Sequence, residues 1–418
     1  MRNLLLSTLL LVGCASGTKV MQKENLKANS EKAMKAPYVL LISIDGYRWD
    51  YTKKYQPKFL SKFQYEGASL KSLRPSYPTK TFPNHLSIMT GRYPMNHGIV
   101  ANGFYAPDLK KSYSLRDRNA VENGDFYLSL PLWGLAERQG MRTATYFWPG
   151  SEAEIQGQRP SYYLRYNHGT KHEERIKTVE SWFKLPEEKR PHFATLYFHD
   201  VDSAGHNYGP DSKEVEAAIH KVDKSIEKLV TNLEKLELPL NIVIVSDHGM
   251  AALKKENFEL VAKDKAQNKL IQDNFIVKGK GPIIQFYSKE TGKISLKESL
   301  SILNKNAKNY RCYFGNKTPK KLNFRNHPRV GDMVCIAKKD WSIGITDISV
   351  PKGNHGWSQY DGNDMHAIFY AKGPQFKRSY QLGTRNNTNI YPLLAKVLGL
   401  DLDVKIDGKL KYMSSLLK

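Results

Sequence analysis

Three aspartates and three histidines follow, or lie next to, short apolar runs of the chain: Asp45, Asp202, His206, Asp247, His248 and His355. Taken singly, each has a common structural explanation, because Asp-Gly favours turns and most histidines are hydrogen-bonded structural residues. Together they form a set, since YVLLISI leads into Asp45, HFATLYFHDV leads into Asp202, and NIVIVS leads into Asp247. The carboxyl ends of parallel strands meet at one edge of a sheet, so we expect these side chains to converge.

Mixed carboxylate and imidazole ligands suit Zn²⁺, which binds oxygen and nitrogen in tetrahedral sites. Six such ligands are enough for two Zn²⁺ ions, and two ions a few ångströms apart stabilise an in-line displacement at phosphorus. The residue set therefore predicts a centre with two Zn²⁺ per chain, although Mn²⁺ and Co²⁺ accept the same ligands.

The stretch PTKTFPNH, residues 78–85, supplies a candidate nucleophile. Pro83 suits the first turn of a helix, which we predict to begin near Asn84, with its free backbone N–H groups directed at Thr81 and at an anion. A threonine hydroxyl attacks phosphorus only when a metal or a base lowers its pKa. Without the metal ligands, the simplest interpretation of Thr81 is a helix N-cap.

The elements that must position these residues alternate along the chain. Apolar runs predict strands at Tyr38–Ile44, Thr143–Trp148, His192–Phe198, Asn241–Ser246 and His366–Ala371. Helical patterns occur at Pro57–Glu66, Leu132–Gln139, Glu173–Phe183, Ser212–Leu236 and Ile390–Leu398. This alternation predicts an α/β fold with a mostly parallel sheet sandwiched by helices. Residues 252–350 do not continue this alternation of strands and helices. They predict a smaller α+β insertion within a catalytic domain of residues 37–418. We expect this insertion to form one wall of the substrate pocket.

The composition fits a large globular domain with a basic surface. Of 418 residues, 40% are hydrophobic, and 64 Lys and Arg against 41 Asp and Glu give a net charge of +23. The lysines are scattered rather than gathered on one helix, which is typical of a solvated surface and not of a specific nucleic-acid groove. Such a surface attracts small anionic substrates.

The N-terminal residues predict that the protein is exported across the cytoplasmic membrane. Residues 1–14 read as a signal peptide that ends in LVGC, which resembles a bacterial lipobox with lipid attached to Cys14. The alternative is an ordinary secretory signal in which the cysteine is incidental. Residues 15–36 are polar and rich in lysine and predict a flexible tether. We therefore expect a protein of the bacterial cell envelope that is lipid-anchored and faces the periplasm. In that oxidising compartment Cys312 and Cys335 either form a disulfide or stay as two buried thiols.

Seven motifs carry a resemblance to a known family: ISIDGYR, PTKTFPNH, GRYPMNHGIVANGFY, FWPGSE, DVDSAGHNYGP, VSDHGM and GNHGW. In content and order they resemble the nucleotide pyrophosphatase/phosphodiesterase family of the alkaline phosphatase superfamily, over about residues 37 to 410. The resemblance implies an alkaline phosphatase-like core in which Thr81 is the nucleophile and forms a covalent nucleotidyl intermediate. It implies that Asn102 helps to bind a non-bridging phosphate oxygen. It implies one zinc held by Asp45, Thr81, Asp247 and His248, and a second zinc held by Asp202, His206 and His355.

The same resemblance indicates the substrate. Phe82 and Tyr166 match aromatics that sandwich a nucleobase in nucleotide-hydrolysing relatives, and Leu115 matches an apolar contact in that pocket. Base stacking is worth roughly 1–3 kcal/mol and tolerates any base. We therefore expect a monomer that cleaves nucleoside triphosphates, dinucleotides or cyclic dinucleotides to 5′-mononucleotides. The alternative for Phe82 and Tyr166 is ordinary core packing.

Two other functions stay open at this point. A choline-phosphate or glycerophosphodiester hydrolase acting on lipid headgroups would use the same metal centre. A non-catalytic envelope lipoprotein that binds nucleotides would have lost a ligand or the nucleophile, yet all these positions are filled.

Overall fold

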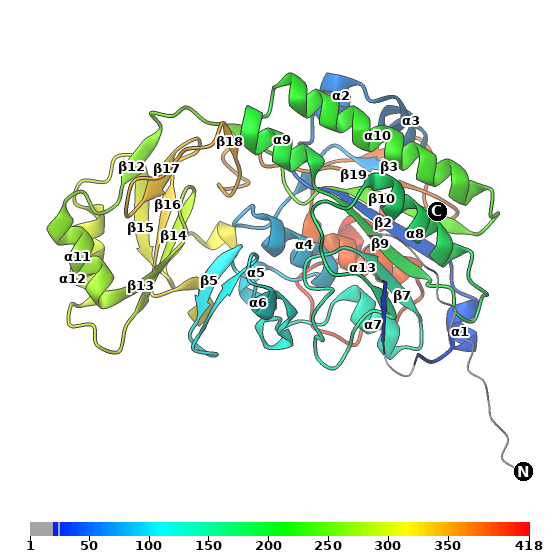
Figure 1. Cartoon of the computed structure of the whole chain (residues 1–418), viewed down its shortest axis with the longest axis horizontal. Helices are drawn as coiled ribbons and strands as arrows, with labels where there is room; N and C mark the ends of the chain where they lie inside the picture. The colour runs from blue at the N-terminus through cyan, green and yellow to red at the C-terminus, as the bar shows by residue number, and fades with distance from the viewer. Residues whose placement is uncertain (1–19, 24–25) are drawn as a thin grey trace, which may run out of the picture.

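The computed structural model describes residues 20–23 and 26–418, and its main feature is a nine-stranded sheet (Figure 1). The strand order across the sheet is β1 (Met21–Gln22), β8 (Tyr162–Tyr163), β7 (Thr143–Tyr146), β9 (Phe193–Phe198), β2 (Tyr38–Ile44), β10 (Leu240–Val245), β19 (Phe369–Lys372), β3 (Ala68–Leu70) and β20 (Tyr380–Leu382). Strands β8, β7, β9, β2 and β10 run parallel to one another. This confirms the predicted α/β fold with a mostly parallel sheet.

The predicted strand at His366–Ala371 differs from the others in direction. It forms as β19 but pairs antiparallel with both β10 and β3. An apolar run specifies burial and not strand direction, which the path of the chain around the sheet decides.

Helices cover both faces of this sheet. Strand β2 alternates between two cores: Val39 and Leu41 face one, and Leu40, Ile42 and Ile44 face the other. The second core includes α3 (Lys58–Glu66), α8 (His172–Phe183) and α10 (Lys213–Glu234), and the first includes α4 (Thr81–Thr90), α7 (Leu132–Arg138) and α13 (Ile390–Val397). A strand buried on both faces is mostly apolar, which explains why Ser43 is the one small polar residue in the run YVLLISI.

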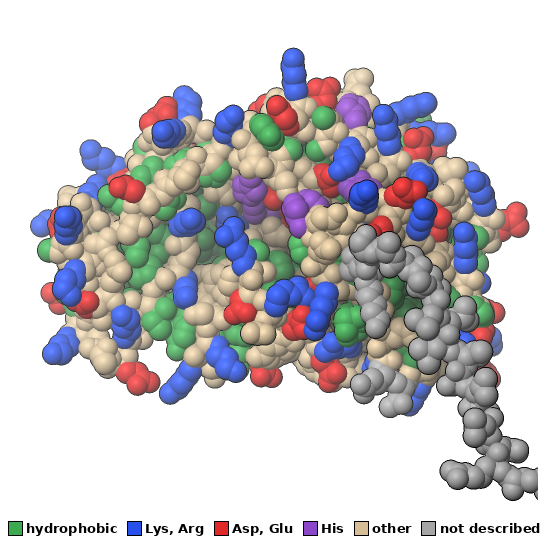
Figure 2. All heavy atoms as spheres, viewed as in Figure 1, with side chains coloured by type: hydrophobic (Ala, Val, Ile, Leu, Met, Phe, Trp, Pro, Cys, Tyr) green, Lys and Arg blue, Asp and Glu red, His purple; other side chains and the backbone are tan. Residues whose placement is uncertain are grey.

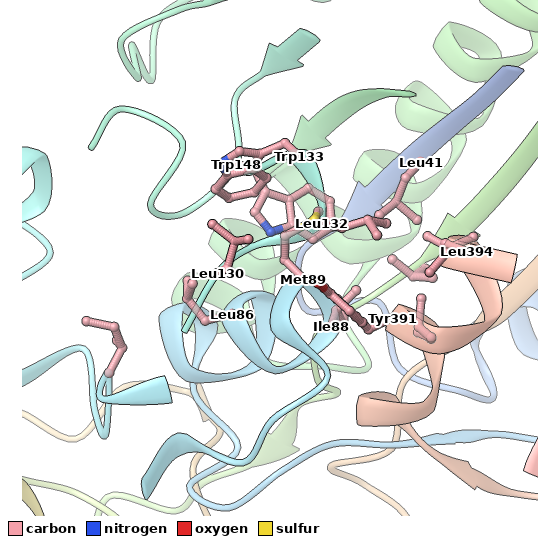
Figure 3. Close-up of a cluster of buried hydrophobic side chains, with 14 of the residues drawn as sticks. Leu41, Leu86, Ile88, Met89, Leu130, Leu132, Trp133, Trp148, Tyr391 and Leu394 are labelled. Atoms are coloured by element: carbon pink, nitrogen blue, oxygen red, sulfur yellow. The ribbon is translucent and has the colours of Figure 1, made fainter. Parts of the chain in front are cut away.

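Helix α4 is held by one of these cores (Figure 3). Its side chains Leu86, Ile88 and Met89 are buried and pack in the cluster that contains Trp133 and Leu394. Burying a side chain of this size stabilises the fold by about 1.5–3 kcal/mol. The first turn of α4, which carries Thr81, is therefore fixed to the core.

Residues 252–350 form a second, smaller unit at the opposite end of the molecule from α1 (Glu31–Met34) in Figure 1. Its antiparallel sheet has the order β13 (Phe275–Lys278), β14 (Ile283–Ser288), β16 (Met333–Ala337) and β15 (Tyr310–Phe314). Helices α11 (Lys265–Asn274) and α12 (Leu296–Asn304) accompany it, and it has a hydrophobic core of its own. Cys312 and Cys335 are direct neighbours on β15 and β16 and form a disulfide.

The N-terminal segment differs in part from the predicted tether. Within its described residues, β1 adds an edge strand to the main sheet by pairing with β8, and α1 contributes the buried Ala33 to the core. Asn29 fixes the chain between them, because its side chain donates to the carbonyls of Glu187 and Arg190. Cys14 and the predicted signal peptide lie outside the described residues, so lipid attachment stays a prediction.

Across residues 20–23 and 26–418, none of the helices combines the length and the apolar character that a membrane span requires.

Helix α3 depends on a cap from another helix. It follows Pro57, whose side chain cannot cap it, and Asp223 of α10 instead accepts hydrogen bonds from the N–H groups of Phe59 (3.1 Å) and Leu60 (2.7 Å).

We expect Asp223→Ala to lower the free energy of unfolding by about 1–2 kcal/mol, because it leaves these donors without a partner. Asp223→Asn should recover part of the loss, and the exposed neighbour Lys224→Ala should match the wild type in urea denaturation. Equal stability of all three variants would contradict the prediction.

Candidate metal centre and its pocket

The structure brings the six predicted ligands together. Asp45 follows β2, and Asp247 and His248 follow the neighbouring parallel strand β10. His355 directly follows β18 (Gly353–Asn354), which pairs with β11 (Ala251–Ala252). The turn after Asp45 requires glycine: Gly46 has φ +68°, and a Cβ there would lie 2.9 Å from Cα and Cβ of Asp202.

Asp202 and His206 lie on helix α9 (Asp200–Tyr208), which follows β9. Their four-residue spacing puts them one helical turn apart on the same face, with His206 Nε2 3.5 Å from Asp202 Oδ1. The helix therefore presents both side chains to the centre as a pair.

Two overlapping groups of ligand atoms result. In the first, Nε2 of His248 lies 3.4 Å from Oδ1 of Asp45 and 3.0 Å from Oδ2 of Asp247. In the second, Nε2 of His355 lies 3.6 Å from Asp202 Oδ1 and 3.1 Å from Nε2 of His206. Ligand atoms of Asp45, Asp247 and His248, and likewise of Asp202, His248 and His355, lie within 4.8 Å of one another. His248 thus borders both groups, and its ring stacks on that of His355 with centroids 3.5 Å apart.

The three imidazoles share one tautomer. Nδ1 lies 2.9 Å from the Gly249 carbonyl in His248, 2.9 Å from the Gly353 carbonyl in His206, and 2.7 Å from the Thr79 carbonyl in His355. A carbonyl only accepts hydrogen bonds, so each Nδ1 carries the proton and each Nε2 presents a lone pair to the centre. Backbone carbonyls orient metal-ligating histidines in this way.

The electrostatics of the centre also fit a cation. Burial, followed by repulsion from Asp247 and Asp202, raises the pKa of Asp45 well above its ordinary value. Burial acts the same way on Asp247, but the neighbouring imidazoles of His248 and His85 outweigh it and lower the pKa of Asp247. One buried oxygen of each carboxylate lacks a hydrogen-bond partner among the described residues: Asp45 Oδ1, Asp202 Oδ1 and Asp247 Oδ2. Orphaned anionic oxygens beside imidazole lone pairs are a donor set that suits Zn²⁺.

The nucleophile loop is built differently from the prediction. Helix α4 begins at Thr81 and not near Asn84, so Thr81 belongs to the first turn, and its Oγ1 lies 3.3 Å from Nε2 of His248. Pro83 is still accommodated, because N–H groups in the first turn have no partner within the helix. The other hydroxyl of the loop is structural: Thr79 is buried, donates to the carbonyl of Trp357 and accepts from the N–H of Gly356.

Two asparagines hold this loop and its surroundings. The buried Asn84 donates to the carbonyls of Pro78 (3.1 Å) and Lys80 (2.9 Å), which fixes the approach to Thr81. The oxygen of Asn102 accepts from the N–H of Phe82 at 3.0 Å. Because the oxygen is engaged, the amide nitrogen of Asn102 is the end that can donate to a phosphate oxygen.

A cavity of about 430 Å³ opens above the centre. Its lining includes Asp45, Thr81, Asp202, His206 and His355, and also all the predicted substrate contacts: Phe82, Asn102, Leu115 and Tyr166. The ring of Tyr166 stands against that of Phe147, with centroids 5.1 Å apart, and its backbone N–H donates to Glu152. No residue of 252–350 lines this cavity among the described residues, so the predicted wall from the insertion is not found there.

Two buried side chains of the site escape the sequence prediction. Tyr197 of β9 donates a 2.5 Å hydrogen bond to Oδ2 of Asp45, and the ring of His85 lies 3.4 Å from Oδ2 of Asp247. Had the helix been predicted to begin at Thr81, the four-residue spacing between Thr81 and His85 would have been a signal for His85. Nothing in the sequence marks Tyr197, which looks like one more apolar residue of its strand.

Comparisons with known proteins place this centre in context. The model of the type I phosphodiesterase/nucleotide pyrophosphatase family matches residues 39–358. Human ectonucleotide pyrophosphatase/phosphodiesterase family member 1 is 35% identical over 378 residues, which span 87% of this chain and 40% of that protein. The bis(5′-adenosyl)-triphosphatase enpp4 of Xenopus laevis is 29% identical over 367 residues, with 87% of this chain and 78% of that protein covered.

Solved structures of ectonucleotide pyrophosphatases/phosphodiesterases also resemble this chain. Murine ectonucleotide pyrophosphatase/phosphodiesterase 5 superimposes with a TM-score of 0.84 at 29% identity, over 91% of this chain and 100% of that one. A second structure holds an inactive threonine-to-alanine variant of the murine protein in complex with AMP. The chain spans less than half the length of the human relative.

The crowding of carboxylates predicts how the protein responds to metal removal. Wild-type protein should unfold at a lower temperature after treatment with EDTA and recover when Zn²⁺ is added, because a cation offsets the repulsion among Asp45, Asp202 and Asp247. Asp45→Asn removes one of the repelling charges, so in EDTA it should melt no lower than the wild type and gain little from Zn²⁺. The exposed Asp273→Asn serves as the control and should behave as the wild type. A wild-type melting temperature that ignores both EDTA and Zn²⁺ would count against a metal centre.

Proposed function

This chain belongs to the type I phosphodiesterase/nucleotide pyrophosphatase family, and we propose that it hydrolyses phosphodiester or pyrophosphate bonds of nucleotides to release nucleoside 5′-monophosphates. One observation carries the proposal: the hydroxyl of Thr81 lies 3.3 Å from Nε2 of His248, inside a six-ligand centre that opens into a cavity with aromatic walls.

The proposed cofactors are two Zn²⁺ ions. One would be held by Asp45, Thr81, Asp247 and His248, and the other by Asp202, His206 and His355. Bound zinc supplies positive charge that lowers the pKa of a coordinated hydroxyl and offsets charge on phosphate oxygens.

The chain's own residues supply the nucleophile and the geometry. Thr81 Oγ1 attacks phosphorus in line, its bond to phosphorus forms, and the bond to the leaving oxygen breaks, which leaves a nucleotidyl ester on Thr81. The amide nitrogen of Asn102 donates to a non-bridging oxygen, where negative charge develops. Water then displaces Thr81 from phosphorus and restores the hydroxyl, with the nucleoside 5′-monophosphate as product.

The cavity favours a nucleotide as substrate. Phe82 follows the nucleophile directly, and Tyr166 lines the same cavity together with the apolar Leu115. A flat base fits between such side chains, with its phosphate at Thr81. The AMP bound to the murine relative and the dinucleotide named for the Xenopus relative support this substrate class. We therefore propose nucleoside triphosphates, dinucleotides and cyclic dinucleotides as substrates.

Removing the nucleophile tests the mechanism. We expect Thr81→Ala to lower kcat for the nitrophenyl ester of thymidine 5′-monophosphate by about 10⁴-fold or more, because loss of a nucleophile removes the covalent route. Thr81→Ser keeps the hydroxyl and should retain measurable turnover. The assay follows nitrophenol release from the zinc-loaded protein, with EDTA as the negative control.

The same assay separates the alternatives. Turnover of nitrophenyl phosphocholine alone would replace the nucleotide proposal with a headgroup phosphodiesterase. No turnover of either ester with added Zn²⁺, despite binding of AMP, would favour a non-catalytic nucleotide-binding protein.

The aromatic walls give a second prediction. Phe82→Ala and Tyr166→Ala should each raise KM for the thymidine ester by about 5- to 150-fold, the equivalent of roughly 1–3 kcal/mol of base stacking. Hydrolysis of bis(nitrophenyl) phosphate, which lacks a base, should change little. Tyr208→Ala provides a matched control, since Tyr208 is an exposed tyrosine and does not line the cavity. Equal losses on both substrates would instead assign Phe82 and Tyr166 to packing.

A further inference from the structure

His85 lies directly beneath the nucleophile. It is fully buried on helix α4, one turn after Thr81, and its Nδ1 lies 2.9 Å from the backbone carbonyl of Thr81. Because a carbonyl only accepts hydrogen bonds, Nδ1 carries the proton and donates a hydrogen bond to this carbonyl. The imidazole is thus bound to the backbone of the residue that performs the attack.

The same ring reaches two strands of the main sheet. Nδ1 is also 3.4 Å from Oδ2 of Asp247, which follows β10. On the other side of the ring, Nε2 lies 2.8 Å from the hydroxyl of Ser43, two residues before Asp45 on β2. The tautomer with the proton on Nδ1 leaves Nε2 to accept from this hydroxyl. One side chain therefore joins the nucleophile helix to both strands that supply the first group of ligands.

Packing prevents the ring from turning. Its plane stands edge-on to Trp148 and Tyr197, with centroids 5.0 and 5.4 Å away. The indole N–H of Trp148 donates to the carbonyl of His85, and Tyr197 donates to Asp45. A residue needed only to fill space would not require polar contacts on both ring nitrogens.

We propose that His85 is a positioning residue that sets Thr81 and Asp247 relative to each other through its Nδ1–H. This inference rests on the proposed function, since it concerns the geometry of the attack. Loss of the Nδ1–H would leave the Thr81 carbonyl without its donor and would remove the polar N–H that lies 3.4 Å from Oδ2 of Asp247. Turnover and metal affinity should both suffer, whereas the substrate pocket should stay intact. Groups that orient metal ligands in other proteins are worth 10- to 100-fold in affinity or activity.

Three substitutions at His85 separate its polar role from its packing. His85→Asn places an amide N–H near the position of Nδ1, His85→Gln places one near Nε2, and His85→Phe keeps an aromatic ring without any N–H. For each variant we would measure the thermal midpoint, the zinc affinity by chelator competition, and kcat and KM for the thymidine ester at saturating zinc.

We expect His85→Phe to lower kcat and zinc affinity by about 10- to 100-fold each, with KM within about threefold of the wild type. His85→Asn should recover most of both losses and exceed His85→Gln. The proposal is overturned if folded His85→Phe matches the wild type, or if Asn and Gln are equally impaired. If His85→Phe does not fold, the comparison of Asn with Gln decides alone.

The proposed function and the positioning role of His85 can be contradicted separately. If the wild type itself does not hydrolyse the ester, the proposed function fails, and the zinc affinities of Asn and Gln still report whether His85 orients Asp247.

Discussion

Three carboxylates brought together at one edge of the sheet are the constraint on which the rest of the site depends. Burial, and after it repulsion from Asp247 and Asp202, raises the pKa of Asp45. Two like charges about 4 Å apart repel by about 4 kcal/mol at an effective dielectric constant of about 20. The fold holds this arrangement because strands β2 and β10 are buried on both faces, and their ends cannot separate without exposing the core. A bound cation turns the repulsion into attraction.

Hydrogen bonds from outside the ligand set keep the loops of the centre in place. Thr79 joins the loop before α4 to the loop that carries His355. The buried Arg48 donates to the carbonyl of Met250, just after the segment with Asp247 and His248. These contacts orient the side chains before any ligand binds, so little ordering remains to be done when the substrate arrives. Such preorganisation is what electrostatic stabilisation of a phosphoryl transition state requires.

The surface complements an anionic substrate. Lys and Arg side chains are spread over the face shown in Figure 2, and histidines gather near its middle. Arg116 and Arg118 line the cavity itself. Arg118 also forms salt bridges with the carboxylates of Glu122 and Glu152. The net charge of +23 attracts small anions to the surface, and the lysines that carry it are scattered along the sequence. The family relationship agrees with this substrate class.

The sequence by itself determined the central strands and the residue types at their ends. Strand β2 has the predicted bounds, because a strand buried on both faces is a continuous, predominantly apolar run of residues. The tertiary structure decided what depends on distant segments: that Asp202 and His206 lie on a helix, that β19 is antiparallel, and that His248 borders both ligand groups. His85 and Tyr197 acquire their contacts only when α4 and β9 meet the sheet. Local sequence fixes which groups a segment offers, whereas long-range packing fixes which groups they face.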